Sequence, residues 1–391
     1  MTNLSYRVQQ IKPSATLAVA ARSAELTAAG KDIINLSVGE PDFDTPDNIK
    51  AAAIRAIEQG FTKYTAVDGT PELKNAIIQK FQNENQLSYA ADEIIVSCGA
   101  KQVLYNLCQV LLEKGVEAII PAPYWVSYPD MVKLSEAIPV FIRTTYEQRY
   151  KISPAQLQAA ITPQTRLLIL NSPSNPTGIA YTREELRALG EVLLKHPQVI
   201  IVTDDIYEHI LWGAESFCNI LNACPELKDR TVVVNGASKA YAMTGWRLGY
   251  AAGPKAIIAA MKKIQSQSTS NPCSITQKAA VEALNGDQSS IAMMVEAYQK
   301  RQQFLYKSLN EIDGIRCLDA DGTFYAFPDV SECMKRLGIQ NDIDFSEKLL
   351  LEANVAVVPG TEFGAQGHIR LSYATSMDRL EEAVKRMKAI F

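Results

Sequence analysis

The chain has 391 residues, more than one compact hydrophobic core usually serves, so we expect two domains in close contact. The formal net charge is −4 and no block of Lys and Arg stands out, which argues against nucleic acid as a partner and favours a small, anionic metabolite. No run approaches 18 apolar residues, and the opening MTNLSYRVQQIKPS lacks an apolar signal region. The composition therefore predicts a cytoplasmic protein without a membrane span.

Cysteine and histidine usage excludes two further classes. The seven cysteines are spread out without a C-x-x-C pair, as expected of reduced thiols in a cytosolic enzyme rather than of a disulfide framework. The three histidines, His196, His209 and His368, lie far apart in the sequence. A zinc site is therefore not expected, and no metal is predicted.

Short apolar runs alternate with longer helical patterns from about residue 50 to about residue 285. The runs predict buried strands at residues 93–96, 117–120, 167–170, 199–203 and 231–234. Helices are predicted between them, at residues 100–112 and 183–195, and the second opens with the capping box Thr182-x-x-Glu185. This alternation predicts an α/β fold with a mostly parallel sheet between helices.

The C-terminal part of the chain has a different pattern. A helical stretch at residues 291–309 leads into a second α+β region. Its predicted elements are strands at residues 355–358 and 368–373 and a last helix at residues 377–390. We therefore expect an N-terminal segment (residues 1–48) that packs with the small domain, a large domain (residues 49–288) and a small C-terminal domain (residues 289–391).

A polar or aromatic group follows each predicted strand. Ligands of open parallel sheets bind at the carboxyl ends of the strands, so these groups are expected to share one site. In chain order they are a helix N-terminus suited to phosphate, an indole, an amide, a carboxylate with a phenol, and an amine. The residues are Gly99-Ala100-Lys101, Trp125, Asn175, Asp204 with Tyr207, and Ser238-Lys239.

This set of groups matches the needs of pyridoxal 5'-phosphate. Its aldehyde is held as an imine by a lysine that also shuttles a proton, which predicts Lys239. Its ring nitrogen stays protonated beside a buried carboxylate, which predicts Asp204. Asn175 and Tyr207 are candidate donors to the phenolic O3′, and Trp125 can stack on the ring.

The phosphate of the same cofactor needs donors and positive charge. The N–H groups at Gly99 and Ala100, where a helix begins, are suited to a dianion. Arg247, eight residues after Lys239, adds a charge-assisted contact.

Six strings carry a family resemblance: GEPDFDTP, APYWVSYPDM, SPSNPTG, DDIYEH, NGASKAYAMTGWRLGY and VAVVPGTEFGAQGHIRLSYAT. They resemble the class I aminotransferases of pyridoxal-phosphate fold type I, and most closely the bacterial-type aspartate aminotransferase branch. The resemblance runs from about Lys12 to the last helix. It implies a mostly parallel seven-stranded sheet in a large domain, a smaller α+β domain, and a homodimer with shared active sites.

The resemblance also implies residue roles. Lys239 resembles the Schiff-base lysine, Asp204 the ring-nitrogen partner, Tyr207 and Asn175 the O3′ pair, Trp125 the stacking residue and Arg247 a phosphate ligand. Arg370 resembles the arginine that clamps the substrate α-carboxylate. Gly39 resembles the glycine whose backbone approaches the substrate, and Tyr64 the tyrosine that reaches the partner subunit's phosphate.

The chain departs from the family pattern at two places. The stretch QSQSTSNPCSIT lacks the arginine with which animal-type enzymes read the distal carboxylate from the partner subunit. Lys101 stands where the bacterial-type branch is thought to use a lysine instead, although it can equally contact phosphate or solvent. Lys12 and Thr16 match positions shared by prephenate-active members. Gly236 replaces the usual serine three places before the lysine, so phosphate binding is expected to rely on Ser238 and the nearby arginine.

The predicted function is a ping-pong transamination between L-aspartate and 2-oxoglutarate, because Lys101 and Arg370 provide two cations for a dicarboxylate. Prephenate aminotransferase activity, which forms arogenate, remains open, as does another amino-acid aminotransferase. A lyase or decarboxylase with the same cofactor is a further alternative. A transcription regulator is disfavoured because the aminotransferase pattern starts almost at the first residue. A nicotinamide dehydrogenase is disfavoured because no G-x-G-x-x-G follows a strand.

Overall fold

The computed structural model describes residues 4–213 and 216–391, and a seven-stranded sheet forms its centre. In spatial order its strands are β2 (Ile94–Ser97), β8 (Gly249–Ala252), β7 (Thr231–Gly236), β6 (Ile200–Asp204), β5 (Thr165–Asn171), β3 (Glu117–Ala122) and β4 (Ile138–Arg143). β8 runs antiparallel to both neighbours, and the other pairs are parallel. The predicted mostly parallel sheet is confirmed, and its five predicted strands are present. β4 and β8 were not predicted.

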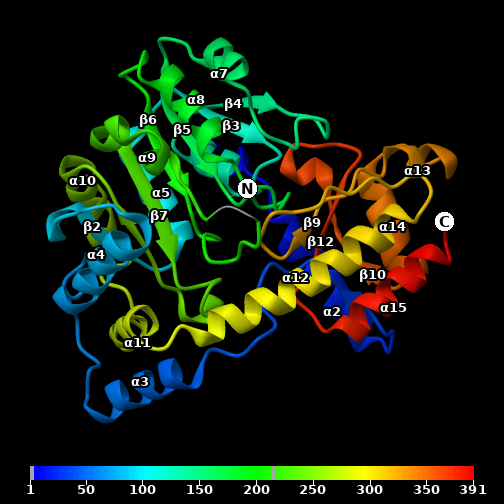
Figure 1. Cartoon of the computed structure of the whole chain (residues 1–391), viewed down its shortest axis with the longest axis horizontal. Coiled ribbons are helices and arrows are strands. Elements are labelled where there is room, and N and C mark those ends of the chain that lie inside the picture. The colour runs from blue at the N-terminus through cyan, green and yellow to red at the C-terminus, as the bar shows by residue number, and fades with distance from the viewer. Residues whose placement is uncertain (1–3, 214–215) are drawn as a thin grey trace.

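Helices cover both faces of this sheet (Figure 1). One face carries α3 (Asp47–Glu58), α4 (Pro71–Asn85), α7 (Pro154–Ala160), α8 (Arg183–Leu193), α9 (Ile220–Ala223) and α11 (Ser274–Asn285), and the other carries α5 (Ala100–Leu111), α6 (Tyr128–Leu134) and α10 (Lys255–Ser266). Successive strand side chains point to opposite faces, so Ile94 and Val96 enter one core and Ile95 enters the other. Within residues 4–213 and 216–391, no helix has the length and apolar character needed to cross a membrane.

Helix α8 shows how the sequence fixes a local boundary. The Thr182 hydroxyl accepts a hydrogen bond from Glu185 N (3.2 Å), and the Glu185 carboxylate accepts one from Thr182 N (2.8 Å). This reciprocal capping box satisfies two N–H groups that a helix start leaves free. Leu186, Leu189 and Leu193 recur at helical spacing and are all buried against the sheet. The predicted start of this helix is confirmed.

A second group of elements surrounds two smaller sheets. β9 (Tyr325–Ala326), β12 (Ile369–Ser372) and β11 (Val358–Pro359) form an antiparallel sheet, and β1 (Ile34–Asn35) pairs in parallel with β10 (Val355–Ala356). The accompanying helices are α2 (Ala15–Ala28), α13 (Ser331–Arg336), α14 (Asp342–Glu352) and α15 (Met377–Lys388). The prediction of one strand over residues 355–358 is wrong, because β10 and β11 pair with different partners in different sheets.

The long helix α12 (Ser289–Asn310) joins the two groups and runs across the molecule in Figure 1. Ile291 at its start packs in one of the two cores of the large sheet. Leu309 near its end packs in a separate core, which surrounds the two smaller sheets. Between them, Arg301 donates to both carboxylate oxygens of Asp42 (2.8 and 2.9 Å) and lies over the Phe43 ring at 5.3 Å. Such a bidentate, charge-assisted pair holds the segment of residues 37–45 against α12.

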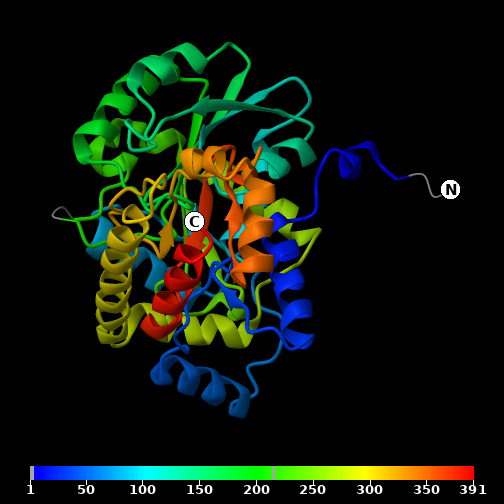
Figure 2. The same ribbon diagram turned by 90° about the vertical axis from the view of Figure 1, so that its right-hand side faces the viewer.

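Near its N-terminus the chain extends away from the rest of the molecule, as Figure 2 shows. This arm carries the short helix α1 (Tyr6–Gln9). Three large apolar side chains on it are mostly exposed, namely Leu4 at 56%, Tyr6 at 72% and Val8 at 50%. Exposed apolar groups gathered on one segment mark a surface suited to contact with another protein surface.

Candidate active site

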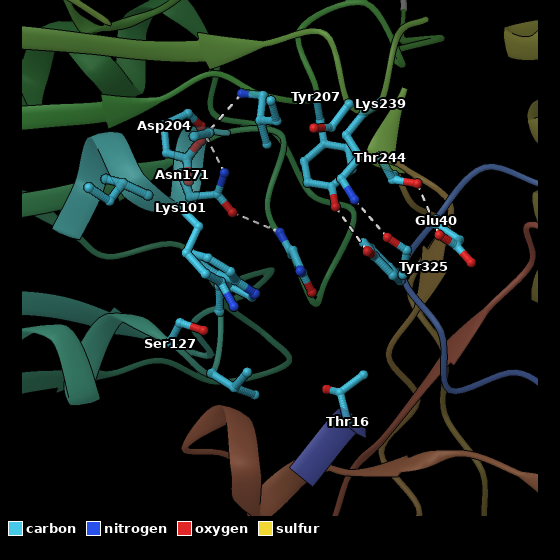
Figure 3. Close-up of a pocket in the computed structure, with 18 of the residues that line it drawn as sticks. Thr16, Glu40, Lys101, Ser127, Asn171, Asp204, Tyr207, Lys239, Thr244 and Tyr325 are labelled. Carbon is cyan, nitrogen blue, oxygen red and sulfur yellow. Dashed lines mark hydrogen bonds between the residues drawn. The ribbon is translucent and has the colours of Figure 1, made fainter. Parts of the chain in front are cut away.

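A cavity of about 390 Å³ lies at the carboxyl ends of the parallel strands, where the small antiparallel sheet and residues 38–40 approach them. Most of the predicted site residues line it: Thr16, Gly39, Ala100, Lys101, Trp125, Asn175, Asp204, Tyr207, Ser238, Lys239, Arg247 and Arg370. Figure 3 shows Lys239 and Tyr325 on one side of the cavity and Lys101 and Ser127 on the opposite side. Each of the five predicted strand ends contributes at least one residue to this cavity.

Three predicted site residues do not line this cavity. Gly99 lies directly behind it, where an added Cβ would come within 2.5 Å of Arg247 Nη2. Lys12 lines a neighbouring cavity of about 700 Å³, whose wall includes Lys101 as well. Tyr64 is 91% exposed and lies outside both cavities. In this single chain Tyr64 therefore contacts no part of the site.

Lys239 follows β7, and its partly buried amine lies in the cavity. Its Nζ donates to the Gly39 carbonyl at 2.6 Å. Burial, followed by the nearby Arg370 charge, lowers the pKa of Lys239 to about 8. A glycine is required at position 39 because a Cβ there would lie 2.3 Å from Tyr325 Oη. The amine is thus poised near neutrality to act as a base.

Asp204 ends β6 and presents a buried carboxylate to the cavity. The Tyr128 hydroxyl donates to its Oδ2 at 2.6 Å, and Ile206 N donates to its Oδ1 at 3.4 Å. Burial raises the pKa of Asp204 to about 6, although both hydrogen bonds act in the opposite direction. Asp205 does not line the cavity, and its Oδ2 accepts from Asn219 Nδ2 at 2.9 Å. Successive side chains point to opposite sides of the chain, so Asp204 faces the cavity and the adjacent Asp205 faces away from it.

Arg370 on β12, the middle strand of the small antiparallel sheet, brings a buried cation to the cavity. Its Nη1 donates to Asn175 Oδ1 at 3.1 Å, and its Nη2 donates to the Ser37 carbonyl at 2.6 Å. Its Nε is buried and has no hydrogen-bond partner among residues 4–213 and 216–391. Tyr325 lies beneath the guanidinium, with its ring centroid 4.5 Å from Cζ. A buried cation with an unused donor is a natural place for a carboxylate.

One end of the cavity is suited to a phosphate. Helix α5 begins at Ala100, directly after Gly99, whose φ is positive (+89°). As at any helix start, the first N–H groups have no intrahelical partner. The β8 backbone packs closely behind this turn, since a Cβ on Gly249 would come within 2.1 Å of Ala100 N. Arg247 and Ser238 line the cavity beside it. Helix dipole, N–H groups and guanidinium together favour an anion here.

The charges that line the cavity are mainly positive. Four cations, Lys101, Lys239, Arg247 and Arg370, face two carboxylates, Glu40 and Asp204. Lys101 Nζ lies 5.0 Å from the Trp125 ring centroid, and burial, with Arg247 beside it, lowers the pKa of Lys101. The cavity is therefore suited to ligands that carry more than one negative charge.

Several cavity residues with polar contacts were not predicted, among them Tyr325, Asn171, Tyr128 and Thr244. Tyr325 shares a hydrogen bond with Tyr207 through their hydroxyls (2.9 Å), and Asn171 Nδ2 donates to the Asp204 carbonyl at 2.8 Å. Tyr128 holds the Asp204 carboxylate, and Thr244 donates to Glu40 at 3.0 Å. Asn171 directly follows the predicted strand at residues 167–170, and Tyr128 and Thr244 stand within family strings, so these positions were the available signal. Tyr325 had no such signal.

One cavity thus holds a lysine amine of lowered pKa, a buried carboxylate and a helix start suited to an anion. These groups are expected of one enzyme class, and comparison with known proteins agrees. Residues 31–387 match the family model described as aminotransferase class I and II. The chain belongs to this family and is an aminotransferase, as the resemblance had indicated.

Two relatives that match this chain over nearly their full lengths carry the same name. It is 60% identical to an aspartate/prephenate aminotransferase of Nitrosomonas europaea, over 99% of each chain. It is 53% identical to the enzyme of the same name from Cereibacter sphaeroides, over 100% of this chain and 98% of that one.

Solved structures confirm fold type I. The aspartate aminotransferase of Rhizobium meliloti is 48% identical, with a TM-score of 0.96 over 100% of this chain and 98% of that one. The aspartate aminotransferase of Thermus thermophilus with maleate is 44% identical, with a TM-score of 0.95 over 100% of both chains.

Proposed function

We propose that this aminotransferase uses pyridoxal 5'-phosphate to move the amino group of L-aspartate to 2-oxoglutarate, giving oxaloacetate and L-glutamate in a ping-pong reaction. The observation that carries the proposal is the placement of the Lys239 amine, whose pKa is lowered to about 8, in one cavity with the buried Asp204 carboxylate and two further cations, Arg370 and Lys101. The names of its relatives support L-aspartate as a substrate.

The donor set fits the cofactor. Lys239 is the amine for its aldehyde, Asp204 the anion for its ring nitrogen, Asn175 and Tyr207 the partners for its O3′, and Trp125 the stacking ring. Its phosphate would be held by Gly99, Ala100, Ser238 and Arg247. The absence of room for a Cβ at positions 99 and 249 supports a tight backbone cradle there. When bound, the cofactor supplies an electron sink for the charge left on the substrate carbon.

The chain's own groups then have defined tasks. Arg370 lines the cavity, and its guanidinium would bind the substrate α-carboxylate and so orient the Cα–H bond. Lys239 Nζ takes the proton from Cα and returns it on the other side of the reaction, because its lowered pKa leaves a neutral fraction near neutrality. Asp204 stays anionic above about pH 6 and stabilises a positive charge opposite it.

The class of substrate follows from Lys101, the cation proposed to act together with Arg370. Lys101, with Thr16 from α2, faces the cavity from the side opposite Lys239 and would bind a distal carboxylate. The maleate in the Thermus thermophilus structure is also a dicarboxylate, which supports this choice. Prephenate is a second candidate acceptor, because Lys12 lines a larger cavity that shares Lys101 and because relatives carry that name.

The half-reaction tests this proposal directly. L-Glutamate added to the cofactor-loaded protein, without an oxo acid, is expected to convert the yellow absorbance to that of the pyridoxamine form and to release 2-oxoglutarate in equal amount. D-Glutamate is the control, because it reverses the arrangement of groups at Cα. Production of ammonia without an acceptor would indicate a lyase, and an unchanged spectrum would exclude transamination.

Replacement of Lys101 by alanine tests the substrate class. The variant is expected to lose about a hundredfold in kcat/KM for L-aspartate and about threefold or less for L-alanine, since only the former needs a second cation. Steady-state kinetics with both donors measures the ratio. Lys114→Ala, which removes an exposed lysine, is the matched control and is expected to change neither value. An equal loss for both donors would exclude a role in reading the distal carboxylate.

We also propose a homodimer with shared active sites. Tyr64 is 91% exposed and Leu17 is 70% exposed, and the apolar arm around Tyr6 has little cover. Coverage by a second copy accounts for these surfaces, and the family resemblance gives Tyr64 a place at the partner subunit's phosphate.

For the rest of the organisation we keep the boundaries expected from the sequence. Residues 49–288 would form the large domain and residues 289–391 the small one, with residues 1–48 packed on the latter. The two separate cores and the pairing of β1 with β10 support this division. We propose a cytoplasmic location, because no disulfide joins any two cysteines within residues 4–213 and 216–391.

A further inference from the structure

The carboxylate of Asp204 is held from behind by a tyrosine. Tyr128 is 2% exposed, and its hydroxyl donates to Asp204 Oδ2 at 2.6 Å. This is the shorter of the two hydrogen bonds on the carboxylate, since the bond from Ile206 N to Oδ1 measures 3.4 Å. A hydrogen bond to a carboxylate in a buried site is strong and fixes the orientation of the group.

The chain around Tyr128 is built to hold this contact. Tyr128 is the first residue of α6, and its N–H donates to the Trp125 carbonyl at 3.0 Å, so one turn carries both residues. The Trp125 and Tyr128 rings meet edge to face at 5.3 Å. Both residues line the cavity, and the Tyr128 hydroxyl reaches the carboxylate at the end of β6. Displacement of either ring would disturb the other.

We infer that Tyr128 is a positioning residue that occupies Oδ2 of Asp204, keeps the carboxylate ionised, and leaves Oδ1 for the cofactor's ring nitrogen. This rests on the proposed function, in which Asp204 is the partner of that nitrogen. In this role Tyr128 acts through Asp204, to which its hydroxyl donates.

The electrostatics of the site agree with this role. Besides Tyr128, the side chains that act on the carboxylate are Lys239 from the turn after β7 and Tyr207 from the turn after β6. The adjacent Asp205 is turned toward Asn219 and Thr203 instead. Burial and the Asp204 charge raise the pKa of Tyr128 well above its usual value, so the phenol stays a neutral donor at every working pH. Loss of this donor leaves a buried anion less stabilised, which raises the pKa of Asp204.

The test is equilibrium binding of pyridoxal 5'-phosphate to cofactor-free protein, followed by tryptophan fluorescence between about pH 5 and about pH 9. For Tyr128→Phe we expect affinity about tenfold weaker at pH 7, and an acid limb of the affinity–pH curve about one unit higher than in the wild type. The shift is upward because a carboxyl with a raised pKa is protonated, and so loses its charge, at a higher pH. Tyr250→Phe, which removes another buried phenol, is the control and should bind as the wild type does.

A double-mutant cycle separates positioning from general structural support. In an Asp204→Asn background, Tyr128→Phe should change affinity by no more than about twofold, because the charge it acts on is absent. Equal losses in both backgrounds, or a Tyr128→Phe curve that coincides with the wild type, would overturn this inference and leave the proposed function standing. Failure of the wild-type protein to bind the cofactor would overturn both.

Discussion

Lys239→Ala is expected to abolish transamination, with kcat for L-aspartate and 2-oxoglutarate lowered by about 10⁴-fold or more. Under the proposed function, the Lys239 amine serves both as the attachment point for the cofactor and as the base at the substrate Cα. No other lysine replaces it, since Lys101 lies on the opposite side of the cavity. Steady-state rates and the yellow absorbance of the purified protein are the two measurements.

Two controls separate chemistry from folding. Lys263→Ala removes an exposed lysine on α10 and is expected to leave the rate unchanged. Lys239→Arg keeps a positive charge in the cavity but lacks a titratable amine, so it should be as inactive as the alanine variant. An alanine variant that still exchanges amino groups near the wild-type rate would end the proposed function.

Arg370→Ala is expected to lower kcat/KM for every amino-acid substrate by about 10³-fold. The guanidinium is buried, already donates to Asn175 and Ser37, and keeps one donor unused. Its loss removes the proposed carboxylate clamp and also leaves two buried acceptors without their donor. A destabilisation of about 1–3 kcal/mol should accompany the change, visible in thermal unfolding.

The comparison of substrates distinguishes the clamp from mere loss of stability. Arg370→Ala should affect L-alanine and L-aspartate alike, because both carry the α-carboxylate, whereas Lys101→Ala should affect mainly L-aspartate. Arg370→Lys keeps the charge without the forked geometry and should recover only part of the activity. A loss confined to dicarboxylic substrates would show that Arg370 reads the distal group instead.

Much of the fold was predictable because its strands are short, apolar and β-branched. The run at residues 231–234 reads TVVV, and β7 extends it by two residues. β8 is Gly-Tyr-Ala-Ala, whose small residues give no strand signal, and its place between β2 and β7 is set by packing. β4 contains a proline and has Ile138 about half exposed, as an edge strand permits, so neither burial nor alternation marks it.

The site was predictable where a residue stands at a strand end or in a family string. Lys239, Asp204 and Asn175 meet in the cavity because the parallel strands before them end at one edge. Tyr325 comes from β9, about 120 residues beyond Tyr207 in the sequence, and no local pattern indicates that their hydroxyls meet. Contacts of that kind depend on how the two cores are placed against each other, which periodicity does not encode.

The pairing of Arg301 with Asp42 connects helix α12 to the segment that lines the cavity. The start of α12 packs beneath the large sheet, and its end packs in the core around the two smaller sheets. The paired carboxylate lies three residues from Gly39, whose carbonyl receives the Lys239 amine. Because Asp42 and Gly39 belong to one short segment, a displacement of α12 would be transmitted to the part of that segment that lines the cavity.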